Sequence, residues 1–174
     1  MDGDRRRREI VKILGSDKKP ISGTVLAGRF GVSRQVIVQD IALLRATDKN
    51  ILSTNKGYML YEAQESGRYK RTFAVCHKDD ETKEELYLIV DCGAQLRDVV
   101  IEHDVYGQIS VDLIITSRKD ADEFLKKMDS GKDKPLKELS DGIHYHTVEA
   151  SDEAILDAVE QKLKEHGFLL DFHE

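Results

Sequence analysis

Residues 23–46 constrain the fold more than any other segment, because two short amphipathic patterns there flank a glycine turn. Residues 23–30 and 34–46 each repeat apolar side chains at intervals of three and four, which is typical of helices. Gly31 permits a positive φ between them, and Ser33 can cap the second helix. Two helices joined in this way predict a helix-turn-helix.

The second predicted helix has an apolar and a polar face. Ile37, Ile41 and Leu44 recur at helical spacing and are expected to point inward. The outward face near the helix N-terminus is where a recognition helix meets base edges, and Arg, Gln and Val suit guanine, adenine and the thymine methyl group. The predicted DNA-contacting residues of this segment are Ser33, Arg34, Gln35, Val38 and Gln39.

The flanking segments complete a winged helix. Residues 5–14 predict a first helix with a basic flank, and residues 51–60 predict two short strands around an Asn-Lys-Gly turn. Lys56 at the tip of this wing is expected to lie beside the phosphate backbone. We therefore expect a winged helix-turn-helix DNA-binding domain over residues 1–60. The alternative is a three-helix module used for protein contacts.

The charge of the chain is divided unevenly. Residues 1–60 carry a formal charge of +6. The net charge of the chain is −6, so residues 61–174 carry −12. A basic segment joined to an acidic one indicates that the first contacts a polyanion, although surface charge can also be uneven by chance. A helix-turn-helix binds two half-sites best as a dimer, so we expect a homodimer on double-stranded operator DNA.

Other features indicate the compartment. No stretch reaches about 18 apolar residues, and the first residues lack the apolar core of a signal peptide. Two cysteines are too few for a disulfide scaffold. We expect a cytoplasmic protein with no membrane partner.

The acidic remainder alternates between strand-like and helical patterns. Residues 61–70 are polar and without a strong period, which predicts a linker. Residues 71–174 then predict a ferredoxin-like βαββαβ domain with a C-terminal helix, which makes the whole chain α/β of the α+β type. In this plan the first and last strands are antiparallel neighbours, and the second lies at the opposite edge. The expected strands are residues 71–76, 96–103, 108–116 and 143–148, and the expected helices are residues 81–92, 117–128 and 151–166.

All six histidines lie in the acidic part, which is the strongest indication of a site. His77 ends the first predicted strand and is expected to lie beside the start of the last one. His144 and His146 share a face of that last strand because strand side chains alternate. Imidazole is a ligand common to Zn, Ni, Cu and Fe, so three histidines together predict a transition-metal site.

A carboxylate from the next helix can complete this predicted site. Glu85 lies eight residues beyond His77, and Glu81 and Glu84 are weaker candidates. The alternative for His144 and His146 is a surface pair on an edge strand. His103 is expected to be structural or interfacial, and His166 and His173 are expected to interact with the helix C-terminus or to be exposed. Cys76 and Cys92 are expected to be small buried apolar residues.

These residues together carry a family resemblance. The segment 32–45, Val-Ser-Arg-Gln-Val-Ile-Val-Gln-Asp-Ile-Ala-Leu-Leu-Arg, and the wing Gly57-Tyr58 resemble the helix-turn-helix type shared with biotin repressors. Followed by Val75-Cys76-His77 and His144-Tyr145-His146, they resemble the niacin-responsive repressors of NAD biosynthesis, which carry a three-histidine domain.

The resemblance implies a dimeric repressor of genes for NAD biosynthesis or niacin uptake that responds to nicotinic acid. It also implies that a divalent transition metal, Ni, Zn or Fe, binds His77, Glu85, His144 and His146. Two alternatives stay open: a repressor whose effector is the metal ion itself, and a metalloenzyme with an appended winged helix. Neither a Gly-rich phosphate loop nor a G-x-S-x-G motif is present, and we expect no enzyme activity.

Overall fold

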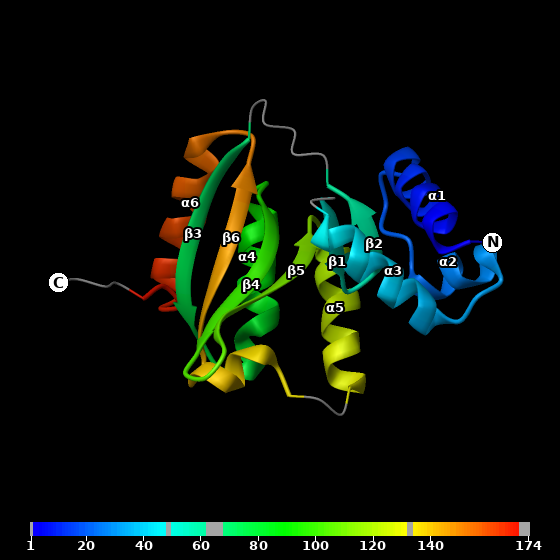
Figure 1. The fold of residues 1–174 in the computed structure, drawn as a ribbon. Helices are drawn as coiled ribbons and strands as arrows, with labels where there is room; N and C mark the ends of the chain where they lie inside the picture. Colours follow the sequence, from blue (N-terminus) through cyan, green and yellow to red (C-terminus); the bar gives the residue numbers. More distant parts are fainter. Residues whose placement is uncertain (1, 48–49, 62–67, 132–133, 171–174) are drawn as a thin grey trace. The chain divides into compact units, whose positions relative to one another are not determined.

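The computed structural model describes residues 2–47, 50–61, 68–131 and 134–170 (Figure 1). The chain divides after Ala63 into two units, each with its own hydrophobic core. Residues 62–67, most of the expected linker, lie outside the described residues. None of the helices in the described part is long and apolar enough to cross a membrane.

The second and third helices of the N-terminal unit begin and end at the predicted residues, whereas the first extends two residues beyond its predicted bounds at each end. The side chains of Ser22 and Ser33 each accept a hydrogen bond from a backbone N–H three residues later, which caps the second and third helices. Gly31 between them has a φ of 65°, in the left-handed region that glycine tolerates. The helices are α1 (Gly3–Ser16), α2 (Gly23–Phe30) and α3 (Arg34–Ala46).

The predicted wing is a hairpin that is attached to the helices through backbone contacts. Strands β1 (Ile51–Thr54) and β2 (Gly57–Leu60) are antiparallel. Tyr58 and Ile21 exchange two backbone hydrogen bonds of 2.8 Å. A Cβ atom at Gly57 would lie 2.3 Å from the carbonyl oxygen of Ile21, so only glycine fits at this close approach.

The third helix also contains a buried charge that joins it to the first helix. Asp40 is 2% exposed. One carboxylate oxygen accepts a hydrogen bond of 2.6 Å from Arg6, and the other accepts one of 3.1 Å from Arg7. This ion pair fixes α1 against α3.

The C-terminal unit contains a four-stranded antiparallel sheet in the order β3-β6-β4-β5. Each βαβ unit is split by a strand of the other, since β6 lies between β3 and β4, and β4 lies between β5 and β6. The predicted α+β class, a winged helix followed by a βαββαβ domain and a C-terminal helix, is confirmed. The strands are β3 (Tyr69–Cys76), β4 (Gln95–His103), β5 (Gly107–Ile115) and β6 (Ile143–Ala150).

Two details of this sheet differ from the sequence prediction. The second strand, β4, lies inside the sheet and not at its edge, because β6 pairs with it directly. Strand β3 begins at Tyr69, two residues before the predicted start, because pairing with the end of β6 extends it into the polar segment. The first and last strands are antiparallel neighbours, as expected.

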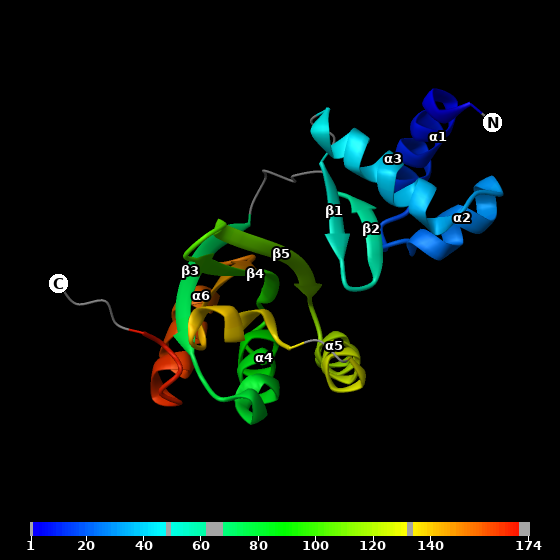
Figure 2. The same cartoon turned by 60° about the horizontal axis from the view of Figure 1, so that its bottom comes forward.

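The α-helices of this unit pack against one face of the sheet (Figure 2). They bury Leu86, Ile89, Leu156 and Leu163 against the apolar side chains of the strands. The C-terminal segment pairs with part of the β3 edge, where Val75 forms a bridge with Leu169. The helices are α4 (Thr82–Asp91), α5 (Arg118–Ser130) and α6 (Glu153–Glu165), and two short 3₁₀ helices, η1 (Asp79–Glu81) and η2 (Leu136–Ser140), precede α4 and β6.

Candidate metal centre

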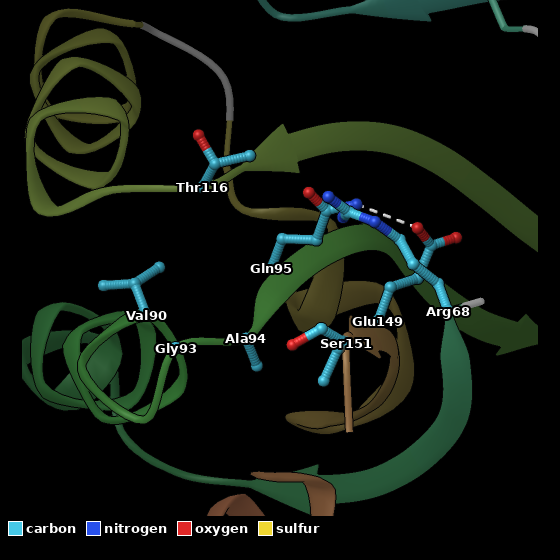
Figure 3. Close-up of a pocket in the computed structure, with 9 residues that line it drawn as sticks. Arg68, Val90, Gly93, Ala94, Gln95, Thr116, Glu149 and Ser151 are labelled. Carbon is cyan, nitrogen blue, oxygen red and sulfur yellow. Dashed lines mark hydrogen bonds between the residues drawn. The ribbon is translucent and has the colours of Figure 1, made fainter. Parts of the chain in front are cut away.

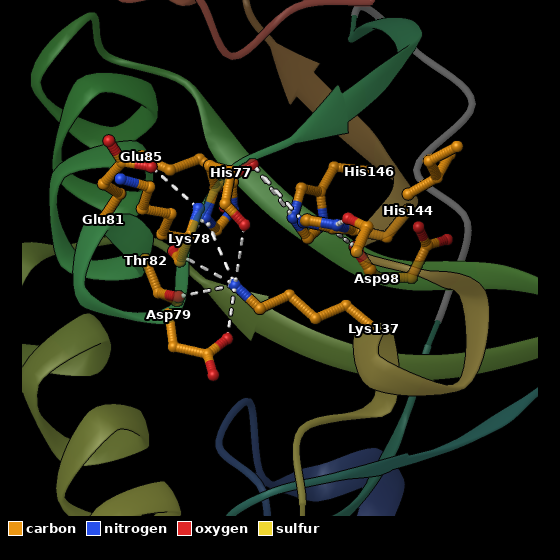
Figure 4. Close-up of polar contacts among 12 residues, drawn as sticks. His77, Lys78, Asp79, Glu81, Thr82, Glu85, Asp98, Lys137, His144 and His146 are labelled. Atoms are coloured by element: carbon orange, nitrogen blue, oxygen red, sulfur yellow. Dashed lines mark hydrogen bonds and ion pairs between the residues drawn. The ribbon is translucent and has the colours of Figure 1, made fainter.

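Three histidines and one glutamate meet at the end of the sheet where β3 ends and β6 begins (Figure 4). His144 and His146 pair across the sheet with Val75 and Phe73, two buried core residues, and are themselves buried. Their common face is the one predicted from the strand period. The side chains of His77, which follows β3, and of Glu85 on α4 join them, with exposures of 0% and 1%.

The ring nitrogens of the three histidines surround the Glu85 carboxylate. Nε2 of His77 lies 2.7 Å from Oε2 of Glu85. Nε2 of His146 lies 3.3 Å, and Nε2 of His144 3.7 Å, from the other oxygen, Oε1. The ligand atoms of His77, Glu85 and His144 all lie within 4.8 Å of one another. His146 reaches the same group through Oε1 of Glu85.

Backbone carbonyl oxygens hold the opposite side of each imidazole. Nδ1 of His77 lies 2.8 Å from the carbonyl oxygen of Lys78. Nδ1 of His144 lies 2.9 Å from that of Gly142, and Nδ1 of His146 lies 2.7 Å from that of Asp98. Histidines that bind metals usually donate their second ring N–H to such a group, which fixes the ring and leaves Nε2 as the ligand atom.

A β-bulge supplies one of these carbonyl groups. The register between β4 and its neighbours shifts between Leu96 and Val100, and Asp98 lies within this irregular segment. Opposite it, Ile114 on β5 has a φ of 54°, which is rare for a β-branched residue. Bulges re-aim backbone groups, and this one presents the Asp98 carbonyl group to His146.

The electrostatics of the group favour a bound cation. Burial alone would raise the pKa of Glu85, but the neighbouring histidines outweigh it and hold this pKa well below the usual range. Burial lowers the pKa of His144, whereas for His146 the Glu85 carboxylate outweighs burial and raises the pKa. Oε1 of Glu85 is buried without a hydrogen-bond partner. A negative charge, a carboxylate oxygen without a hydrogen bond and three imidazole nitrogens at one point fit a transition-metal ion by their donor chemistry.

A buried lysine beside this group was not predicted from the sequence. Nζ of Lys137, on η2, lies 3.3 Å from Nδ1 of His77 and 3.0 Å from a carboxylate oxygen of Asp79. Lys137 is 6% exposed. Its position 60 residues beyond His77 gives no periodic signal, because it depends on how η2 packs against the sheet end.

The weaker carboxylate candidates and the remaining histidines have other contacts. Glu81 accepts a hydrogen bond from the backbone N–H of Lys78, and Glu84 lies 3.3 Å from Nε2 of His166 at the surface. Nδ1 of His103 accepts hydrogen bonds from the backbone of the β4–β5 turn. His173 lies outside the described residues. Cys76 and Cys92 are free, half-buried thiols.

The predicted DNA-contacting residues lie on α3 and the wing. Ser33 is the N-cap of α3, and its side chain is exposed, as are those of Arg34, Gln35 and Gln39. Val38 on α3 is half-buried. Lys56, in the turn between β1 and β2, is half-buried as well. Contact of these side chains with DNA stays a prediction.

A polar cleft of about 260 Å³ lies at the other end of the sheet (Figure 3). Its lining includes Arg68, Gln95 and Glu149. The carboxylate of Glu149 is 1% exposed and accepts hydrogen bonds from Gln95 at 2.8 Å and from Arg97 at 2.9 Å. These contacts hold the beginning of β4 against the end of β6.

Comparisons with known proteins cover both units. Residues 6–59 match the model of an HTH domain, and residues 70–172 match that of the 3H domain. The chain is 43% identical over 166 residues to the probable transcription repressor NiaR of Thermotoga maritima, which covers 95% of this chain and 94% of the relative. It is 41% identical over 170 residues to the transcription repressor NadR of Bacillus subtilis, with coverage of 97% and 94%.

These relatives are repressors and not enzymes, which sets aside the metalloenzyme alternative. The HTH match likewise favours DNA binding over a module for protein contacts. The predicted family is confirmed by identity over nearly the whole length of the chain. The chain therefore belongs to the NiaR/NadR family of transcription repressors.

Proposed function

We propose that this chain represses genes for NAD biosynthesis or niacin uptake, and that nicotinic acid is the effector that it senses through its 3H domain. The observation that carries the proposal is the buried group of three imidazoles around Glu85, whose Oε1 atom lacks a hydrogen-bond partner. A group of this kind is costly to bury unless it binds something. A regulatory ligand site is its simplest use in a repressor.

His77, Glu85, His144 and His146 are the proposed ligands of a divalent transition metal such as Ni, Zn or Fe. Carbonyl groups already orient the three rings, so these side chains need little movement to bind. Four protein ligands leave a coordination position open on a five- or six-coordinate ion. When bound, the ion can accept the pyridine nitrogen or the carboxylate of nicotinic acid at that position.

The winged helix is the proposed contact with operator DNA. Arg34, Gln35, Val38 and Gln39 would contact base edges, and Ser33 and Lys56 the phosphate backbone. Because a helix-turn-helix recognises paired half-sites, the active species is proposed to be a homodimer. Nicotinic acid changes operator affinity only if it binds the DNA-competent dimer more tightly than the other state.

A second candidate function uses the same residues. In a metal-responsive repressor the ion itself is the effector and no pyridine ligand is needed. The buried donor group supports this function as well, and the two candidates differ only in what occupies the open coordination position.

A melting-temperature matrix tests the proposal. The protein is measured as isolated, chelator-treated and reloaded with Ni²⁺ or Zn²⁺, each with nicotinic acid, nicotinamide or NAD. Ligands that bind the native state raise the melting temperature, so nicotinic acid is expected to stabilise only the metal-loaded form. Stabilisation by metal with no further effect of any pyridine would support the metal-responsive repressor.

Variants test whether these melting-temperature shifts depend on the histidines around Glu85. The double variant His144→Ala/His146→Ala is expected to lose both the metal shift and the nicotinic acid shift. His166→Ala, which changes a surface histidine 3.3 Å from Glu84, is the matched control and keeps both. Operator affinity is then measured with and without nicotinic acid, and equal affinities would exclude it as the effector.

A further inference from the structure

Lys137 is a buried cation next to a group that is built to receive another cation. Its Nζ atom contacts four oxygen atoms in addition to Nδ1 of His77. They belong to the Asp79 carboxylate at 3.0 Å, the Lys78 carbonyl group at 3.2 Å, the Thr82 hydroxyl group at 3.3 Å and the His77 carbonyl group at 3.4 Å. An ammonium group has three hydrogens, so these acceptors and the imidazole nitrogen compete for them.

Nδ1 of His77 has two neighbours that cannot both be satisfied (Figure 4). The Lys78 carbonyl oxygen at 2.8 Å needs a hydrogen on Nδ1, whereas the Lys137 ammonium at 3.3 Å needs a lone pair there. Nδ1 of His144 and Nδ1 of His146 also lie within hydrogen-bond distance of a carbonyl oxygen, but of these three nitrogens Lys137 contacts only the Nδ1 atom of His77. In His144 and His146 the hydrogen is therefore expected on Nδ1.

The other nitrogen of His77 indicates where its hydrogen lies without a metal. Nε2 is 2.7 Å from Oε2 of Glu85, and an ionised carboxylate only accepts hydrogen bonds. A hydrogen on Nε2 satisfies this contact and leaves a lone pair on Nδ1 for Lys137. Metal ligation needs the opposite arrangement, with the lone pair on Nε2 and the hydrogen on Nδ1.

We propose that Lys137 is a positioning residue that favours the Nε2–H tautomer of His77 and so makes His77 the exchangeable ligand of the metal group. The effect on metal binding rests on the proposed function, whereas the tautomer is a property of the metal-free chain. Lys137 thus weakens binding of a cation by favouring the wrong tautomer and by its own charge. A lysine that only anchored η2 would have the opposite effect, because its loss would loosen His77.

The first test is a long-range ¹H–¹⁵N spectrum of the imidazoles in the full-length, metal-free protein at pH 8. His77 is expected as the Nε2–H tautomer in the wild type and as the Nδ1–H tautomer in Lys137→Met. His144 and His146 are expected to carry the Nδ1 hydrogen in both proteins. Lys134→Met is the matched control, because this nearby side chain is 82% exposed and pairs with Glu138. A Nδ1–H tautomer of His77 in the wild type would overturn the proposal.

The second test is calorimetric titration with Ni²⁺ and with Zn²⁺. Lys137→Met is expected to bind roughly tenfold more tightly than the wild type, at the lower end of effects from groups behind a metal ligand. Lys134→Met binds as the wild type does. Unchanged or weaker binding by Lys137→Met would contradict the role of His77 as the exchangeable ligand.

A third variant keeps the inference testable if Lys137→Met does not fold. The Asp79 carboxylate, whose side chain is 63% exposed, competes with Nδ1 of His77 for the ammonium. Asp79→Asn is therefore expected to keep the Nε2–H tautomer and to bind metal more weakly, and tighter binding would overturn the proposal. If no protein binds either metal but the tautomer changes as expected, the proposed metal function fails and the role of Lys137 stands.

Discussion

Each unit of this repressor buries a carboxylate, and the two carboxylates differ in their hydrogen bonds. Asp40 in the winged helix is 2% exposed, and both of its oxygens accept hydrogen bonds from arginines. Glu85 in the 3H domain is 1% exposed, but its Oε1 atom has no hydrogen-bond partner and faces imidazole nitrogens. Asp40 has its hydrogen bonds completed within the protein, as a structural carboxylate does, whereas Glu85, the proposed metal ligand, has one oxygen without a hydrogen bond.

The largest effect on stability is expected at Asp40, whose oxygens both accept hydrogen bonds. Asp40→Asn leaves Arg6 and Arg7 facing a neutral amide, and removing one partner of a buried ion pair costs about 3 kcal/mol. Urea unfolding and amide hydrogen exchange in α1 and α3 measure this loss in the N-terminal unit. Metal binding by the C-terminal unit is expected to be unchanged. Wild-type stability of Asp40→Asn would contradict a structural role for this carboxylate.

At Glu85 the main loss is expected in metal binding. Glu85→Gln removes a charged ligand, so the affinity for Ni²⁺ or Zn²⁺ falls by roughly 100-fold or more. The metal-free protein also loses about 1 to 2 kcal/mol of unfolding free energy, because the lowered pKa of Glu85 means that the folded state favours its charge and the three imidazoles lose that partner. Titration calorimetry and urea unfolding give the two values.

A neighbouring residue provides the matched control for this variant. Glu84 precedes Glu85 on α4, its side chain is 54% exposed, and it lies near His166. Glu84→Gln is expected to leave metal affinity unchanged. An equal loss of affinity in both variants would show that the general negative charge of α4, and not the Glu85 ligand, attracts the ion.

Local pattern was sufficient to predict which histidines gather around Glu85, and their binding of a metal stays a proposal. His144 and His146 share a face because of the strand period, and His77 meets them because the first and last strands are neighbours. Glu85 follows from helical spacing in the segment after His77. Asp98 and Lys137 were missed, since a bulge in β4 and the packing of η2 bring them to the site from distant parts of the chain.

In the fold, too, local features were predicted and contacts between distant residues were not. Gly31 and Ser33 mark the boundaries of α2 and α3, because cap and turn residues act on their immediate neighbours. The interior position of β4 was not predicted, since alternation along one strand does not say which strands are adjacent. The pairing of Asp40 with Arg6 was missed for a related reason, because 34 residues separate them and no motif connects them.

Glu149 tests whether a third buried carboxylate behaves as Asp40 does. Burial alone would raise its pKa, but hydrogen bonds from Arg97, Gln95 and Lys70 outweigh it and lower the pKa. A lowered folded-state pKa stabilises the protein above the unfolded value of about 4.3, and this stability is lost as the pH falls through the folded-state pKa. Glu149→Gln is therefore expected to cost about 2 kcal/mol at pH 7.

The pH dependence distinguishes this charge from a simple hydrogen bond. Urea unfolding of the wild type and Glu149→Gln between pH 7 and pH 3 should give two curves that converge as Glu149 becomes protonated. A constant difference between the curves would mean that the loss at pH 7 comes from packing. The metal affinity of Glu149→Gln is expected to equal that of the wild type, because the hydrogen bonds of this carboxylate are made within the protein, at the other end of the sheet.

The smallest effect concerns two serines of the winged helix whose structural roles are the same. Ser22 and Ser33 cap α2 and α3 through hydrogen bonds of 3.2 Å and 3.3 Å from Val25 and Val36. Replacing either by alanine is expected to cost about 1 kcal/mol of stability. If Ser33 also donates to a DNA phosphate, Ser33→Ala weakens operator binding about fivefold more than Ser22→Ala, the equivalent of one hydrogen bond. Equal operator affinities of the two variants would assign Ser33 to helix capping alone, because its hydroxyl group would then bond only within the protein and not to DNA.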